Sequence, residues 1–164
     1  MSRHARSASV LFAIAGVVWA LDRASKLWVE HTLAGRPPIA VIPGVLDLRF
    51  TTNPGGAFSL GQRTPWIFVV ASILVSVAIV ATAFRHTNVA TSLALGLILG
   101  GAVGNLSDRL VRGPGLSGQV VDFVDFHFWP VFNLADSAIV VGAVILAISS
   151  FAAERDREPS HDAG

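Results

Sequence analysis

The chain has 164 residues, of which 52% are hydrophobic and only 14% are charged. Soluble domains carry about 25% charged residues, so this composition indicates a membrane protein, and the length allows one compact domain. The formal net charge of +1, without a cluster of Lys or Arg, gives no sign of a nucleic-acid partner, and the absence of cysteine excludes disulfides, thiolate metal sites and a cysteine nucleophile.

The first apolar segment follows a short basic N-terminus. A cleaved signal peptide would begin in the same way. However, hydrophobic residues resume after Asp22 with Leu27 and Val29, and no small-x-small cleavage pattern follows. We therefore predict a first transmembrane helix over residues 8–29 rather than a cleaved signal.

Residues 30–64 differ from the rest of the chain because Pro and Gly interrupt them too often for a spanning helix. Within this loop, Pro43-Gly44 suits the central positions of a type II turn. Beyond the turn, Leu46, Leu48 and Phe50 alternate with polar residues, which is the pattern of a half-buried strand. We predict a small β-hairpin or sheet that lies on the membrane surface.

Three more apolar segments are long enough to cross about 30 Å of hydrocarbon as helices. In the second of them, glycine recurs at Gly96, Gly100 and Gly104, a small-xxx-small pattern that lets transmembrane helices approach closely. The expected fold is a membrane all-α domain over residues 1–153 with four transmembrane helices. The expected spans are 8–29, 65–84, 88–108 and 134–153, with loops at 30–64 and 109–133 and a polar tail at 154–164.

Four spans place both termini on one side of the membrane and both large loops on the other. The loop side then collects polar residues from the whole sequence: Asp22, Asn53, Asn105, Asp108, Asp122, Asp125, Asn133 and Asp136. Ionised groups near hydrocarbon are costly and indicate a functional site. The loop side holds seven Lys and Arg residues and the terminal side five. The Lys and Arg residues on the terminal side are denser along the sequence. On the loop side, Arg23 and Lys26 can pair with nearby carboxylates. We therefore expect cytoplasmic termini and an extracytoplasmic hairpin.

Five short motifs occur in order along the chain. They are Asp22-Arg-Ala-Ser-Lys26, Asn53-Pro-Gly-Gly-Ala-Phe58, Gly100-Gly-Ala-Val-Gly-Asn-Leu-Ser-Asp-Arg109, Val120-Val-Asp-Phe123 and Phe132-Asn-Leu-Ala-Asp136. This series resembles that of bacterial lipoprotein signal peptidase, the signal peptidase II family. Each motif is weak alone, but five in sequence over about residues 10 to 150 are highly specific.

The resemblance implies an aspartic endopeptidase of the bacterial cytoplasmic membrane. Members of this family remove signal peptides from prolipoproteins, cutting just before a Cys that already carries diacylglyceryl. We accordingly expect a multi-pass membrane protein with an active site near the extracytoplasmic face. We also expect a monomer whose partners are the lipid-modified prolipoprotein and membrane lipids, with no nucleic acid and no cofactor.

The resemblance also assigns the catalytic pair to Asp122 and Asp136. Two carboxylates that share one proton can act as base and acid together, because their repulsion keeps one of them protonated. The ionised partner takes a proton from water, and the protonated partner donates to the oxyanion that forms at the scissile carbonyl. Asp125 lies three residues after Asp122 and competes with it, but it matches no catalytic position of the family.

The other polar residues of the motifs have two alternative roles. By resemblance they bind substrate or orient the catalytic pair, and they are Asn53, Asn105, Arg109 and Asn133. Alternatively they satisfy backbone and interhelical hydrogen bonds, and for Asn105 both roles stay open. Asp22, Lys26 and Asp108 are expected to give structural support, and for Asp22 and Lys26 contact with substrate is an equal alternative. We expect an ion pair between Asp22 and Lys26, and another between Asp108 and the adjacent Arg109.

Other kinds of site have less support. Asp122, Asp125 and His127 lack any metal-ligand spacing pattern, so we expect no metal, and the serines lack a paired base. A transporter would place carboxylates along a pathway through the bilayer, whereas these spans are uncharged in their middles. A membrane assembly protein would need the glycine face but not two carboxylates at one depth. The Gly-rich segment 112–119 departs from compact family members, and we expect it to alter the rim of the site and not its chemistry.

Overall fold

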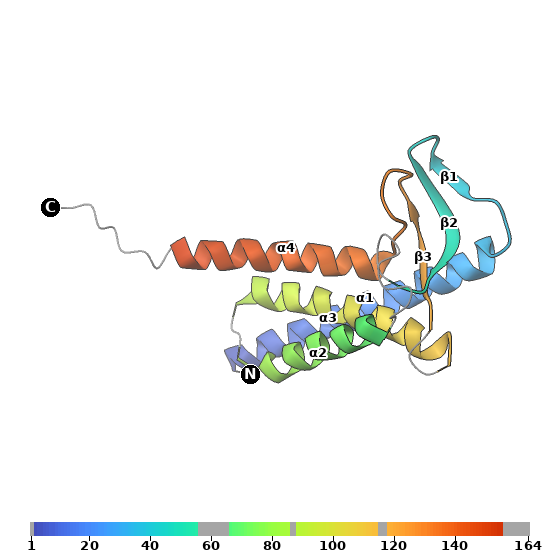
Figure 1. The fold of residues 1–164 in the computed structure, drawn as a ribbon. Coiled ribbons are helices and arrows are strands. Elements are labelled where there is room, and N and C mark those ends of the chain that lie inside the picture. Colours follow the sequence, from blue (N-terminus) through green and yellow to red (C-terminus); the bar gives the residue numbers. More distant parts are fainter. Residues whose placement is uncertain (1, 56–65, 86–87, 115–117, 156–164) are drawn as a thin grey trace.

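The computed structural model describes residues 2–55, 66–85, 88–114 and 118–155. Within them the chain forms helices that lie side by side, with a small sheet at one end of the bundle (Figure 1). The elements in chain order are α1 (Arg3–Leu33), β1 (Ile39–Ile42), β2 (Leu46–Asn53), α2 (Trp66–Thr82), α3 (Val89–Val111), β3 (Val120–Asp125) and α4 (Leu134–Arg155).

Three of the described helices are long and apolar enough to cross a membrane, namely Arg3–Leu33, Val89–Val111 and Leu134–Ala152. The expected spans 8–29, 88–108 and 134–153 lie on these three helices, and α1 is longer than expected at both ends. The expected span 65–84 lies on α2, which is apolar but has only 17 described residues. Large apolar side chains such as Leu74 and Ile148 point outward, so the bundle suits hydrocarbon and not water as its surroundings.

Helix α3 is the centre of the bundle because its glycines let two other helices come close. A Cβ atom on Gly96 or Gly100 would lie 2.7 Å from a backbone oxygen of α1, at Leu11 and Ala15 respectively. On another face of α3, a Cβ on Gly101 would collide with the backbone oxygen of Ala135 on α4. The predicted close-packing face of Gly96, Gly100 and Gly104 is confirmed against α1, while Gly101 on the other face lets the start of α4 pack against α3.

The hairpin predicted around Pro43-Gly44 is confirmed. Val45 N donates to Ile42 O at 2.9 Å, and Gly44 has φ +76°, as the third residue of a type II turn requires. The sheet has a third strand, however, because β3 pairs antiparallel with β2 in the order β1-β2-β3. The third strand, Val120–Asp125, lies in the connection 109–133, for which no strand was predicted. This short apolar run does not alternate, since almost all of its side chains are buried.

The inner face of the sheet packs on the end of α1. Leu48 and Phe50 contact a buried cluster formed by Val29, Leu33, Val121 and Phe123. The apolar alternation of β2 therefore serves the protein core. The exposed apolar side chains of the hairpin lie instead on β1, at Ile39, Val41 and Ile42.

Candidate active site

Asp122 is held at the centre of β3 by two asparagine amides. Its side chain is buried, with 2% of the residue exposed. Asn53 at the end of β2 donates from Nδ2 to Asp122 Oδ2 at 2.9 Å, and Asn133 donates from Nδ2 to Oδ1 at 2.6 Å. The pairing of β2 with β3 brings Asn53 beside Val120, and this places residues far apart in sequence on one carboxylate.

Asp136 lies in the first turn of α4 and forms a reciprocal cap with Asn133. Asp136 N donates to Asn133 Oδ1 at 2.9 Å, while Asn133 N donates to Asp136 Oδ2 at 3.2 Å. Asn105 on α3 donates from Nδ2 to Asp136 Oδ1 at 2.8 Å. A carboxylate in this position is stabilised by the partial positive charge of the helix N-terminus.

One residue, Asn133, links the two carboxylates. Asn133 reaches Asp122 through its amide and Asp136 through its backbone N–H. Both carboxylates open into a cavity of about 410 Å³, called here the active-site cavity. Its polar lining is Asn53, Ser72, Asn105, Arg109, Asp122 and Asp136, and its apolar lining includes Phe68, Ala71, Trp129, Phe132, Ile139 and Val140.

Arg109 is buried at the wall of the active-site cavity. Its Nη1 donates to the backbone oxygens of Pro54 and Gly118, both at 3.3 Å, and its guanidinium lies 5.4 Å from the ring centroid of Phe68. The expected pair between Asp108 and Arg109 was wrong, because successive side chains on a helix do not face each other. Arg109 faces the cavity, whereas Asp108 faces α1.

A buried ion cluster lies behind the carboxylates. Lys26 Nζ contacts Asp22 Oδ2 at 2.8 Å, so the predicted ion pair of α1 is confirmed. Asp108 pairs with Lys26 at 3.1 Å, with Arg23 at 2.7 Å and with Arg112 at 3.0 Å. Asp22 Oδ1 also accepts from Ala135 N at 3.0 Å. The cluster therefore connects α1 and α3 to the first turn of α4.

Burial and the neighbouring Asp136 charge raise the pKa of Asp122 to about 6. Hydrogen bonds from Asn53 and Asn133 and the charge of Lys26 act in the opposite direction, because each favours the ionised form. A carboxyl group with this pKa is protonated in about half of the molecules at pH 6 and in about a tenth at pH 7. The pair can thus carry a single proton while one member stays ionised.

Comparison with known proteins shows the family of the chain. The sequence model of the family described as signal peptidase (SPase) II matches residues 14–152. A protein of Rhodococcus jostii named lipoprotein signal peptidase is 41% identical over 140 residues, which are 85% of this chain and 71% of that protein. One of the same name from Desulfitobacterium hafniense is 44% identical over 136 residues, 81% of this chain and 87% of its own length. The chain belongs to the signal peptidase II family.

Solved structures show the same fold as this signal peptidase II family member. A bacterial membrane enzyme solved by the in meso method at 2.3 Å resolution aligns with a TM-score of 0.79 at 24% identity, over 94% of this chain and 95% of its own. A second bacterial membrane enzyme, at 1.9 Å resolution, gives 0.72 at 28% identity, over 86% and 92%. The family makes the chain a protease of the aspartic type and a bacterial membrane protein.

Asp125 lies outside the site of this signal peptidase II family member. It pairs with Arg49 at 2.9 Å and accepts from His127 N at 2.8 Å. Residues three apart on a strand point to opposite faces, so Asp125 cannot share the cavity with Asp122. His127 contacts Asp47 at 3.0 Å, and among the described residues no group of three or more acidic, His or Cys side chains could hold a metal.

Sequence reasoning missed the aromatic and backbone parts of the site. Phe68 and Trp129 line the cavity, and the oxygens of Pro54 and Gly118 hold Arg109. Trp129 belongs to the aromatic segment before α4, which was a visible signal of an apolar wall. A Cβ on Gly118 would collide with the Arg109 backbone. The Gly-rich segment 112–119 therefore packs directly against the site at Gly118. Residues 115–117 lie outside the described residues.

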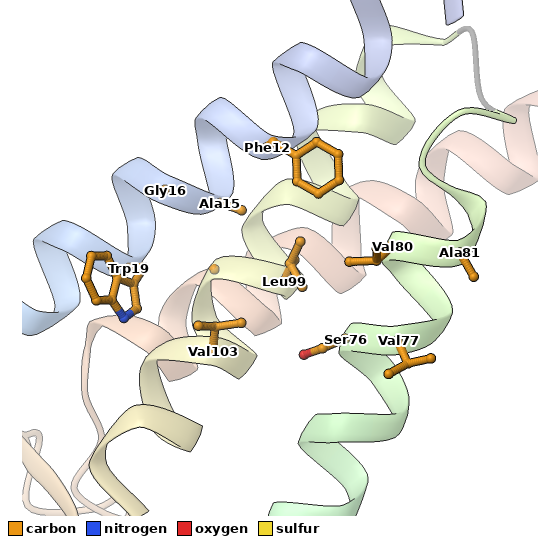
Figure 2. A pocket seen from close by; sticks show the side chains of 11 residues that line it. Phe12, Ala15, Gly16, Trp19, Ser76, Val77, Val80, Ala81, Leu99 and Val103 are labelled. Carbon is orange, nitrogen blue, oxygen red and sulfur yellow. The ribbon is translucent and has the colours of Figure 1, made fainter. Parts of the chain in front are cut away.

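A second cavity of about 620 Å³, called here the apolar cavity, lies between α1, α2 and α3 (Figure 2). Its walls come from Phe12 and Trp19 on α1, Val77 and Val80 on α2, and Leu99 and Val103 on α3, among others. Among the described residues, no carboxylate, amide or basic group lines it. It therefore has no group that could activate water, although it is the larger of the two.

Proposed function

We propose that this chain removes the signal peptide from diacylglyceryl-modified prolipoproteins, cleaving before the lipid-modified Cys, with Asp122 and Asp136 as its catalytic pair. The observation that carries the proposal is the bridge through Asn133. That bridge joins two carboxylates from β3 and α4 in one cavity. Membership of the signal peptidase II family supplies the substrate class, since relatives are named lipoprotein signal peptidase.

The chemistry follows from the different surroundings of the two carboxylates. Asp136 at the N-terminus of α4 is the ionised partner, because the helix end and the Asn105 amide stabilise its charge. Asp122 is the protonated partner, because burial disfavours its charged form. Asp136 removes a proton from water, the water oxygen bonds to the scissile carbonyl carbon, and Asp122 donates to the developing oxyanion. Collapse of the intermediate breaks the C–N bond, and the leaving amine takes up a proton from the pair.

The surrounding polar residues hold this pair and the substrate. Asn53, Asn105 and Asn133 orient the carboxylates through the hydrogen bonds already described. Arg109 fixes the segment that follows Asn53, through the oxygen of Pro54, and brings a positive charge to the wall where carbonyl groups of a peptide would lie. We assign Asp22, Lys26 and Asp108 to support of this framework.

The proposal includes a topology. Residues 1–153 form one peptidase domain with four spans, and the protein is a monomer. Both termini are cytoplasmic, and the sheet and the site lie at the extracytoplasmic face. The exposed apolar side chains of β1 and the exposed Trp28, Phe128 and Trp129 near the sheet support contact with the lipid interface. Residues 154–164 would form a cytoplasmic tail, of which 156–164 lie outside the described residues.

Cysteine labelling tests the topology cleanly because the chain has no native cysteine. Arg36 and Arg85 are both exposed and lie at opposite ends of the bundle. We expect Arg36→Cys to react with an impermeant thiol reagent in intact cells and Arg85→Cys to react only after lysis. The reverse pattern would contradict the proposed orientation.

A cleavage assay in liposomes tests the function. Purified protein should cleave a prolipoprotein that carries diacylglyceryl on its lipobox Cys and should leave the unmodified precursor largely intact. Ion flux measured in the same liposomes separates the peptidase from a transporter, and we expect no flux above that of empty vesicles. Flux without cleavage would overturn the proposal.

A further inference from the structure

Lys26 has an unusual environment for a lysine. It is completely buried on α1, yet its ammonium group has three acceptors: Asp22 Oδ2 at 2.8 Å, Asn105 Oδ1 at 2.9 Å and Asp108 Oδ2 at 3.1 Å. An ammonium group has three N–H donors and no acceptor. The contact with Asn105 is a hydrogen bond and the two carboxylates form ion pairs, so the ammonium group is held from three sides.

This position determines how the Asn105 amide is oriented. Because Lys26 can only donate, the amide group must present its oxygen to Lys26. The amide nitrogen is then turned to the other side, where it donates to Asp136 Oδ1 at 2.8 Å. Asn133 Nδ2 supports the same orientation by donating to Asn105 Oδ1 at 3.2 Å. An amide flipped the other way would place its oxygen against the Asp136 carboxylate, and the two would repel.

We propose that Lys26 is a positioning residue for the catalytic pair, which acts through Asn105 to keep a hydrogen-bond donor on Asp136. The inference rests on the proposed function, since it assigns Lys26 a role in that reaction beyond support of the helix bundle. Lys26 does not line the active-site cavity. Apart from the effect of its charge on the pKa of Asp122, its contact with the catalytic pair passes through the side chain of Asn105.

A double-mutant cycle tests whether Lys26 acts through Asn105. The variants are Lys26→Met, Asn105→Ala and the double variant, each assayed for kcat and KM on a diacylglyceryl-modified precursor. We expect each single variant to lower kcat by about 10- to 100-fold, as misplaced catalytic groups do, with KM changed by less than about twofold. We expect the double variant to be no slower than the slower single variant, because the second change removes a contact already lost.

Arg23→Met provides the matched control. It also removes a cation from Asp108, at 2.7 Å, but Arg23 has no contact with Asn105. Asp108 retains Lys26 and Arg112, so we expect activity within about threefold of wild type. Combined with Asn105→Ala, it should multiply the two single effects, as independent sites do. Multiplicative losses for Lys26→Met with Asn105→Ala, or a change confined to KM, would overturn the proposal.

Loss of Lys26 leaves Asp22 without its cation, so the cycle is run in two backgrounds. The second background carries Asp22→Asn, which removes the unpaired charge and keeps an oxygen for Ala135 N. The cycle is interpreted in the background where all four proteins keep their helical circular dichroism. Wild type and Asp136→Asn are assayed alongside. If wild type does not cleave, the proposed function fails, whereas cleavage with multiplicative losses rejects only the role of Lys26.

Discussion

The active-site cavity and the apolar cavity share α2 and α3 as walls but differ in the residues that line them. The apolar cavity is larger, about 620 Å³ against about 410 Å³, and its lining offers hydrocarbon with one serine hydroxyl. The active-site cavity collects two carboxylates, two amides and a guanidinium from four elements, namely β2, α3, β3 and α4.

This difference shows what identifies a reaction site in a membrane protein. Hydrocarbon can fill an apolar gap at little cost, so the size of a cavity says little about its use. Buried ionisable groups are expensive and are retained where they are paired or functional. The position of the convergent polar groups, at the end of the bundle beside the sheet, therefore locates the chemistry better than volume does (Figure 1).

The largest effect should come from the two carboxylates of the active-site cavity. Asp122→Asn and Asp136→Asn should each lower kcat/KM by about 10³-fold or more, because neither role can be filled by an amide. Asp125→Asn should retain most activity, since Asp125 pairs with Arg49 outside the cavity. All three should remain folded in the membrane. An inactive Asp125→Asn beside an active Asp122→Asn would reverse the assignment.

A matched pair of substitutions on α2 tests the comparison directly. Ala71 lines the active-site cavity and Ala81 lines the apolar cavity, and both are exposed enough to accept a larger side chain. Ala71→Phe should reduce kcat/KM by about 10- to 100-fold, because a ring in the cavity displaces the peptide from the catalytic pair. Ala81→Phe should change it by less than about twofold. Equal losses would mean that the apolar cavity also takes part in turnover.

The pH profile should respond to a change in the active-site cavity. Asp122 must carry a proton, and its pKa is raised to about 6, so log kcat/KM should fall as pH rises above this region. Asn53 favours the ionised form by donating to Asp122 Oδ2. Removing this donor in Asn53→Ala should raise the pKa further and move the alkaline limb to higher pH. A limb that stays in place or moves to lower pH would contradict the protonation states proposed for the pair.

The smallest effect should come from the serine of the apolar cavity. The Ser76 hydroxyl points from α2 into this cavity (Figure 2), and its buried oxygen has no hydrogen-bond partner in the part of the chain that the structure describes. Ser76→Ala should leave cleavage unchanged and should raise stability slightly, by about 1 kcal/mol at most, because a buried unpaired hydroxyl is costly. Thermal unfolding in nanodiscs measures this. A clear loss of stability would show that the hydroxyl has a partner in the membrane.

Much of the fold could be predicted because local sequence patterns indicate it. Uninterrupted apolar segments indicated the helices, the glycine spacing indicated a close helix contact on α3, and Pro43-Gly44 indicated the hairpin turn. The strand β3 was missed because its burial pattern depends on pairing with β2. The packing of Leu48 against the protein core was likewise not predictable, because an alternating strand can turn its apolar face to lipid or to protein.

The composition of the site was easier to predict than its connections. Motif order pointed to the residues that line the cavity, and depth along the helices pointed to one end of the bundle. The hydrogen-bond and ion-pair partners of each side chain could not be predicted, because they depend on how each helix is rotated about its axis. Asp108 reaches Arg23, Lys26 and Arg112 and not its neighbour in sequence. The contact from Lys26 to Asn105 links residues 79 positions apart and leaves no local signal.

The position of α4 at the end of the described chain has a consequence for biosynthesis. A ribosome that has released only the segment through β3 has made Asp122 but not Asp136 or Asn133. The contact from Ala135 to Asp22 closes across 113 positions, so it forms only after α4 has entered the membrane and docked on α3. Under the proposed mechanism, a chain that ends before α4 lacks one of the two catalytic carboxylates, so we expect it to have no hydrolytic activity.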